Sequence, residues 1–142
     1  MKIIILRHAN PGKDGISAVG KLEVEDLAIK LTSVVGSGKA ATIWSSTAPR
    51  AEDTAKLLAL KLSVDDVVYK PELWSDKDHQ HNIDWLRGEV ARFEGGILIL
   101  ITHLEYTVEF PQALGFEESS IPSYAEGFMI EGCTCTRVTW KP

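Results

Sequence analysis

Three short apolar runs, at residues 3–6, 42–44 and 97–101, are rich in β-branched side chains and end in polar residues. The runs are nearly continuous instead of alternating between apolar and polar positions. This pattern is typical of strands that are covered on both faces in a parallel sheet. The hydrophobic pattern therefore predicts three buried, parallel strands.

Between these runs, apolar residues recur at the three- and four-residue spacing of a helix face. The stripes are Val24, Leu27, Ala28 and Leu31; Ala51, Ala55, Leu58 and Leu62; and Ile83, Leu86, Val90 and Phe93. A fourth helix is predicted within residues 105–114, where Pro111 would kink it or confine it to one side. Because strands and helices alternate, the sequence predicts an α/β fold.

The C-terminal part of the chain has a different pattern. Residues 128–130 and 133–140 flank Glu131-Gly132, which predicts an antiparallel hairpin at one edge of the sheet. Cys133 and Cys135 would lie on one face of its second strand, and a packing role there is favoured over a metal or redox role. The expected fold is a three-layer α/β sandwich, with a mostly parallel sheet, helices on both faces and this hairpin at the edge.

Length and charge narrow the class of protein. A chain of 142 residues with 44% hydrophobic and 25% charged residues predicts one compact domain over residues 1–142. The net charge of −5 argues against a broad nucleic-acid surface, which needs clustered Lys and Arg. The apolar runs are too short for a signal peptide or a membrane span. We therefore expect a soluble, cytoplasmic protein that binds neither nucleic acid nor membranes.

Polar residues follow each of the three predicted strands. They are Arg7 and His8, then Ser45, Ser46 and Arg50, and finally Thr102 and His103. Ligands of open parallel sheets bind beyond the carboxyl ends of the strands, so these side chains are expected to meet. Two arginines and two histidines at one place predict a local anion site in an acidic protein.

The residue types point to phosphate chemistry. Arginine presents planar forks of N–H donors that suit phosphate oxygens, and a helix beginning near Arg50 adds a partial positive charge. A neutral imidazole such as that of His8 is an accepted covalent nucleophile. Each residue also has a plainer interpretation: His103 as a core histidine, Arg50 as a surface ion-pair partner, and Ser45-Ser46 as a helix cap.

Three motifs, "LRHA", "SSTAPRAEDTA" and "ITHLE", together resemble the signatures of the histidine phosphatase superfamily, also called phosphoglycerate mutase-like. The resemblance spans the whole chain. It implies that His8 is the phosphorylated nucleophile, that Arg7 and Arg50 bind phosphate and that His103 stabilises the transferring group. It implies no metal and no other cofactor, because cationic side chains supply the electrostatic stabilisation.

Several positions depart from the commonest superfamily pattern. Many members have Gly where this chain has Ala9 and Leu104, and both variants resemble the small protein-phosphohistidine phosphatases, as does the stretch Pro71-Glu72-Leu73. The resemblance therefore implies a phosphatase acting on a phosphorylated protein or on a small phosphorylated molecule. A phosphate-binding module without turnover and a small-molecule phosphomonoesterase are the alternatives.

The acid that protonates a leaving group is less well defined. Glu72, Asp76 and Asp78 are the candidates, and Asp76 is preferred because it lies shortly after a further predicted strand. It is equally well explained as a solvated loop carboxylate. An imidazole leaving group is easier to expel than an alkoxide, so a missing acid favours a phosphoramidate substrate.

Two features remain outside this scheme. His79 and His81 are separated by one residue without a third ligand in a fixed pattern, so we expect loop or pocket-rim residues instead of a metal site.

The short chain also leaves little room for a lid. An open, shallow site that suits a phosphorylated protein surface is therefore expected.

Overall fold

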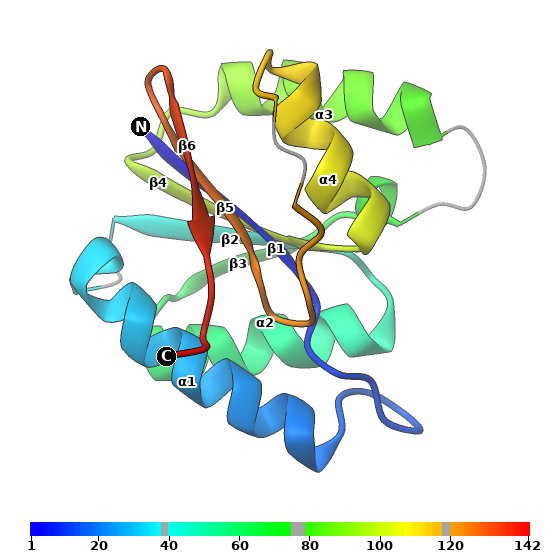
Figure 1. Ribbon diagram of the computed structural model, residues 1–142, viewed down its shortest axis with the longest axis vertical. Helices are drawn as coiled ribbons and strands as arrows, with labels where there is room; N and C mark the ends of the chain where they lie inside the picture. Colours follow the sequence, from blue (N-terminus) through cyan, green and yellow to red (C-terminus); the bar gives the residue numbers. More distant parts are fainter. Residues whose placement is uncertain (38–39, 75–78, 118–119) are drawn as a thin grey trace.

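A mixed β-sheet with helices on both sides forms the protein (Figure 1), and the computed structural model describes residues 1–37, 40–74, 79–117 and 120–142. The strands in these ranges are β1 Lys2–Arg7, β2 Ala41–Ser45, β3 Asp66–Tyr69, β4 Ile97–Thr102, β5 Gly127–Glu131 and β6 Thr134–Val138. The helices are α1 Ala18–Val35, α2 Pro49–Leu62, α3 His79–Arg92 and α4 Leu104–Ala113, and a 3₁₀ turn, η1, spans Pro71–Leu73.

The order of the strands across the sheet is β3-β2-β4-β1-β5-β6. The strands β3, β2, β4 and β1 run parallel, whereas β5 is antiparallel to β1 and β6 is antiparallel to β5. The carboxyl ends of β1, β2 and β4 therefore meet at one edge of the sheet. The predicted α/β fold and the antiparallel hairpin at its edge are both confirmed.

Two apolar layers hold the helices onto the sheet. Helices α1 and α2 cover one face, and α3 and α4 cover the other (Figure 1). All six residues of β4 are buried, with Ile97, Ile99 and Ile101 packing toward α1 and α2 and Leu98 and Leu100 toward the opposite layer. Burial on both faces is why this strand has a continuous apolar sequence.

The further strand predicted shortly before Asp76 is β3, at one edge of the sheet. Its residues Asp66, Val68 and Tyr69 are exposed, and within the described ranges it pairs only with β2. An edge strand that is half solvated does not need a continuous apolar sequence, so its pattern is weaker than those of the buried strands.

Helix α4 continues through Pro111 and ends two residues later. Proline lacks the N–H that would bond to the carbonyl four residues earlier, but in the last turn this loss affects one bond only. No helix in the described part of the chain is long and apolar enough to cross a membrane.

The hairpin turn lies one residue later than predicted. Glu131 pairs with Thr134, so Gly132 and Cys133 form the turn, and Gly132 adopts a left-handed φ of 58° that favours glycine. Cys133 is exposed in this turn, so its predicted packing role in a strand is wrong. Cys135 lies in β6 and packs against the apolar layer on the α3 and α4 side, as predicted.

Candidate active site

The four residues predicted to carry the chemistry come together at the carboxyl edge of the sheet. Arg7 ends β1 and His8 follows it, Arg50 lies in the first turn of α2, and His103 links β4 to α4. The two imidazole ring centres are 5.3 Å apart. Arg50 reaches both rings, with Nε 3.2 Å from His8 Nε2 and Nη2 3.4 Å from His103 Nδ1. The predicted cluster therefore exists as one contiguous group.

The hydrogen bonds of His8 determine its tautomer. Nδ1 lies 2.8 Å from the carbonyl oxygen of Ala9, which can only accept, so Nδ1 carries the proton. Nε2 is then unprotonated and accepts from Arg50. The pKa of His8 is lowered to about 4, mainly by burial and in part by the nearby guanidinium groups of Arg50 and Arg7, against the raising effect of the Ala9 bond. His8 is therefore neutral at pH 7, with a lone pair on Nε2.

His103 has the opposite tautomer. A guanidinium can only donate, so the contact with Arg50 makes Nδ1 an acceptor and places the proton on Nε2. Nε2 then donates to Ser46 Oγ at 2.9 Å. Burial, together with His8 and the two arginines, lowers the pKa of His103 to about 3. Ser46 is not the N-cap of α2, which is Ala48; its hydroxyl orients the second histidine.

Arg7 keeps unused hydrogen-bonding capacity. Its Nη1 donates to the carbonyl of Pro122 at 3.3 Å, and its guanidinium carbon lies 4.1 Å from the ring centre of Tyr124. Nε is buried and has no hydrogen-bond partner in the part of the chain that the structure describes. A buried donor without a partner is costly, so an anion that accepts from it would be stabilised here.

Thr54 connects the loop after β1 to helix α2. Its hydroxyl accepts from the backbone N–H of Ala9 at 3.0 Å and donates to the carbonyl of Arg50 at 2.7 Å. The residue after His8 and the helix that carries Arg50 are thereby held in a fixed relative position. Thr54 belongs to the "SSTAPRAEDTA" motif, but its spacing alone indicates no role.

Two aromatic residues that no sequence pattern predicted also border the site. The ring of Tyr124 is 5.7 Å from that of His8, and the ring of Trp74 is 5.8 Å from that of His103 with an interplanar angle of 28°. Trp74 also lies 5.6 Å from the guanidinium carbon of Arg50. Each aromatic ring thus contacts one histidine and one arginine of the site.

The acid predicted to protonate the leaving group remains a prediction. Asp76 and Asp78 lie outside the described residues. Glu72 lies in η1, and none of the described hydrogen bonds or ion pairs joins it to the four site residues. Glu105, in the first turn of α4, is the carboxylate whose charge raises the pKa of His8, although burial outweighs this effect.

His79 and His81 begin helix α3, so their predicted place in a loop is wrong. His79 forms an ion pair with Glu109 of α4 and lies edge-on to Tyr106, while His81 is exposed. Among the described residues, no group of three or more His, Cys, Asp or Glu side chains is arranged to hold a metal ion.

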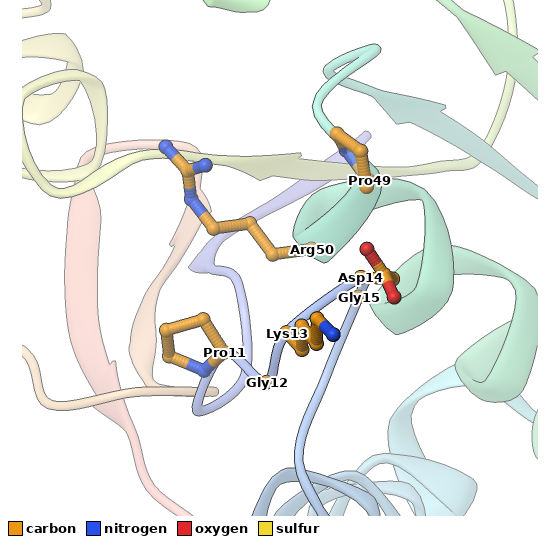
Figure 2. A pocket seen from close by; sticks show the side chains of 7 residues that line it. All are labelled: Pro11, Gly12, Lys13, Asp14, Gly15, Pro49 and Arg50. Atoms are coloured by element: carbon orange, nitrogen blue, oxygen red, sulfur yellow. The ribbon is translucent and has the colours of Figure 1, made fainter.

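A cavity of about 220 Å³ opens beside the aliphatic part of Arg50, between the loop of residues 11–15 and Pro49 (Figure 2). The Arg50 guanidinium points away from this loop, and Lys13 and Asp14 border the cavity. The bond from Gly12 N–H to the Gly15 carbonyl, 2.8 Å long, shapes the loop. The cavity leaves room beside the arginine for part of a substrate.

Comparisons with known proteins identify the fold. No family model matches the chain, and no curated protein matches it. Among solved structures, the protein histidine phosphatase SixA in complex with tungstate superposes with a TM-score of 0.78 at 17% identity, covering 99% of this chain and 97% of that chain. The chain has the histidine phosphatase fold. A phosphoglycerate mutase from Plasmodium falciparum gives a TM-score of 0.71 at 18% identity, covering 99% of this chain and 93% of that chain.

A mycobacterial glucosyl-3-phosphoglycerate phosphatase shows the same fold, with a TM-score of 0.75 at 14% identity over 98% of this chain and 97% of that chain. The predicted resemblance to the histidine phosphatase superfamily is confirmed at the level of the fold. These likenesses extend over nearly the full length of each structure. The histidine phosphatase fold therefore accounts for the whole arrangement of sheet, helices and hairpin.

Acidification tests the neutral state of the two histidines in this histidine phosphatase fold. Their folded pKa values lie below the unfolded value of 6.5, so the unfolded chain binds more protons and the folded state loses stability as pH falls below 6.5. We expect each histidine to lower the free energy of unfolding by roughly 2 kcal/mol between pH 6.5 and 5. Urea denaturation at several pH values measures how the free energy of unfolding changes with pH. In His8→Gln this pH dependence should be weaker than in the wild-type protein. An unchanged pH dependence would contradict the lowered pKa of His8.

Proposed function

We propose that the protein is a metal-independent phosphatase that works through a phosphohistidine at His8 and that its preferred substrate is a phosphohistidine on a protein. The observation that carries this proposal is the tautomer of His8. A neutral, buried imidazole presents its Nε2 lone pair beside Arg50, 3.2 Å from its Nε. This is the form in which histidine is nucleophilic.

Binding of the phosphoryl group rests on the two arginines. Arg7 Nε is buried without a partner among the described residues, and Arg50 lies in the first turn of α2, where the helix dipole adds positive charge. Planar guanidinium donors match the oxygens of a phosphate. They also stabilise the negative charge that develops during transfer, which is the largest contribution in many phosphoryl-transfer enzymes.

In the first step, Arg50 exchanges its bond to His8 for one to a phosphate oxygen. The His8 Nε2 lone pair forms the new N–P bond while the bond between phosphorus and the leaving group breaks, and the leaving group takes that electron pair. The Nδ1 proton, donated to the carbonyl of Ala9, stabilises the positive imidazole that results. In the second step, water attacks phosphorus, the N–P bond breaks and returns its electrons to Nε2, and phosphate leaves with a proton released to solvent.

The nature of the leaving group supports a phosphoramidate. An alkoxide needs a proton as it departs. Among the described residues, Glu105 lies close enough for its charge to raise the pKa of His8, but no carboxyl group forms a described hydrogen bond or ion pair with the four site residues. A phosphohistidine substrate can take a proton from water on its second ring nitrogen and then leaves as neutral imidazole. Ala9 and Leu104 match the small phosphohistidine phosphatases in sequence, and the SixA structure with a similar fold is that of a protein histidine phosphatase.

A turnover panel tests the substrate class. We expect kcat/KM to be highest for a phosphohistidine peptide, lower for an aryl phosphate and lowest for alkyl and sugar phosphates. A reversed order, with sugar phosphates first, would contradict the phosphoramidate assignment. Phosphate binding without turnover of any substrate would favour the alternative of a phosphate-binding module.

Substitution of Asp76 tests whether this residue protonates the leaving group. If no acid serves the leaving group, Asp76→Asn should change kcat/KM less than about twofold for an alkyl phosphate, an aryl phosphate and a phosphohistidine peptide. If Asp76 is the acid, kcat/KM of Asp76→Asn for the alkyl phosphate should fall by about 10²- to 10⁴-fold, and kcat/KM for the aryl phosphate should fall much less. A large loss confined to the alkyl ester would defeat the preference for a phosphoramidate.

Chelation tests the metal-independent mechanism. The electrostatic stabilisation is assigned to Arg7 and Arg50, so we expect full activity after exhaustive dialysis against a chelator. The assay compares treated and untreated enzyme on the same phosphohistidine peptide. A loss that one added divalent ion restores would overturn the metal-independent mechanism.

A further inference from the structure

We propose that Trp74 is a stacking surface for a planar ring on the substrate's leaving group, and thus a determinant of specificity for phosphorylated imidazole or aryl side chains. This inference rests on the proposed function, since the ring departs from the phosphoryl group transferred to His8. It adds a recognition element to the phosphate-binding residues.

The position of Trp74 carries the argument. Its ring contacts two of the four site residues, with the centre 5.8 Å from the ring centre of His103 and 5.6 Å from the guanidinium carbon of Arg50. At the same time Trp74 is 42% exposed. A large apolar ring that borders a polar site and remains open to solvent is available for contact with a ligand.

The backbone beside Trp74 is firmly held, although its side chain is exposed. Leu73 is fully buried, and its carbonyl accepts from the hydroxyl of Thr102, the last residue of β4, at 2.7 Å. The N–H of Trp74 donates to the carbonyl of Pro71 at 3.1 Å. Strand β4, which is followed directly by His103, therefore also holds the backbone next to Trp74 in place. An aromatic group held in place loses little entropy when a ligand stacks on it.

The burial of the two histidines determines in which direction the leaving group of a bound substrate must point. His8 and His103 are only 6% and 7% exposed, so a phosphoryl group bound among the histidines and arginines must project its leaving group toward solvent. Trp74 is the exposed aromatic residue that contacts both Arg50 and His103. Tyr124 instead contacts His8, and its ring is covered by the Arg7 guanidinium, 4.1 Å from the ring centre. The indole is therefore the better placed ring for the departing group.

Binding of non-hydrolysable phosphonates separates stacking from catalysis. We expect phenylphosphonate to bind the wild-type protein about 3- to 10-fold more tightly than methylphosphonate, the range of an aromatic pair. Trp74→Leu should bring the two dissociation constants within twofold of each other by weakening phenylphosphonate alone. Trp74→Phe, which keeps a ring, should retain most of the preference. Calorimetry measures all three proteins with both ligands.

Three peptide substrates then show which kind of ring, imidazole or aryl, stacks on Trp74. Trp74→Leu should lower kcat/KM for a phosphohistidine peptide by about 3- to 10-fold and leave a phosphoserine peptide within twofold. A phosphotyrosine peptide tests an aryl ring on a substrate, and we expect a comparable loss of kcat/KM in Trp74→Leu. No loss for either the phosphohistidine or the phosphotyrosine peptide would contradict a role of Trp74 in turnover.

Three outcomes would overturn the inference. An unchanged phenyl-to-methyl ratio in Trp74→Leu would show that the indole does not contact the ring. An equal loss for both phosphonates would show that Trp74 only positions Arg50 and His103. A wild-type protein without preference for the phenyl ligand would also refute it. The phosphonate experiment needs no turnover, so a protein that prefers phenylphosphonate but hydrolyses nothing would refute the proposed function and retain the stacking surface.

Discussion

His8→Ala is expected to lower kcat/KM by about 10⁴-fold or more on every substrate that the protein hydrolyses. In the proposed mechanism the variant lacks the group that forms the N–P bond, and the nearest imidazole, that of His103, directs Nδ1 toward Arg50 and Nε2 toward Ser46. Losses of this size are typical when the nucleophile of a covalent mechanism is removed. The measurement is kcat/KM on a phosphohistidine peptide and an aryl phosphate.

His81→Ala is the matched control for this variant. His81 is exposed at the start of α3 and has no assigned role, so activity should stay within twofold of wild type. Because removal of the buried His8 ring also leaves a cavity, His8→Gln should be measured in parallel and should be equally inactive. Retention of more than a tenth of wild-type activity in both His8 variants would exclude His8 as the nucleophile.

Arg50→Ala is expected to have the second largest effect, a loss of about 10²- to 10³-fold in kcat/KM. The guanidinium bonds to both histidines at once, with Nε on His8 and Nη2 on His103. Arg50→Lys should recover little of this activity, because an ammonium group cannot reproduce a planar fork of donors. Arg87→Ala, on the exposed surface of α3, is the control and should retain activity.

Arg50→Ala should also change the pKa values of His8 and His103. Arg50 contributes to lowering the pKa of both histidines, but burial is the larger cause. In Arg50→Ala we expect both pKa values to rise and still to remain below 6.5. NMR titration of the imidazole protons follows each ring separately. An activity loss without any change in these pKa values would show that Arg50 does not lie beside the histidines.

The buried strands and the main site residues were predictable from sequence for the same physical reason. A strand covered on both faces, such as β4, must be apolar throughout, so its end is marked by the first polar residues, Thr102 and His103. Parallel strands bring such ends to one edge of the sheet. The meeting of Arg7, His8 and His103 follows from that rule and from the strand order.

The aromatic residues of the site were not predictable in this way, because they lie in irregular segments. Tyr124 precedes Ala125, which adopts a left-handed φ of 57° and donates its N–H to the carbonyls of Arg7 and His8. No local preference favours this conformation for alanine, so tertiary contacts decide it. Trp74 likewise depends on a bond from Thr102 to Leu73 that spans 29 positions of sequence.

The register of the hairpin and the positions of His79 and His81 were also not predictable from local sequence. A glycine is compatible with several positions in a tight turn, so the pattern around Gly132 did not fix the register of β5 and β6, and Cys133 was placed in a strand. His79 and His81 were predicted to lie in a loop or at the pocket rim because two histidines without a third ligand in a fixed pattern do not indicate a metal site. The ion pair of His79 with Glu109, which lies on a different helix, supports the start of α3 and has no local signature.

The phosphorylated intermediate provides the most direct test of the mechanism. The protein should be mixed with a ³²P-labelled phosphohistidine peptide, quenched within the time expected for the first turnover and treated with acid or base. We predict one transient label per chain, labile in acid and stable in base as expected for a phosphorylated imidazole, located on His8 and absent from His8→Ala. Turnover without a labelled intermediate, or a label that persists in His8→Ala, would contradict catalysis through His8.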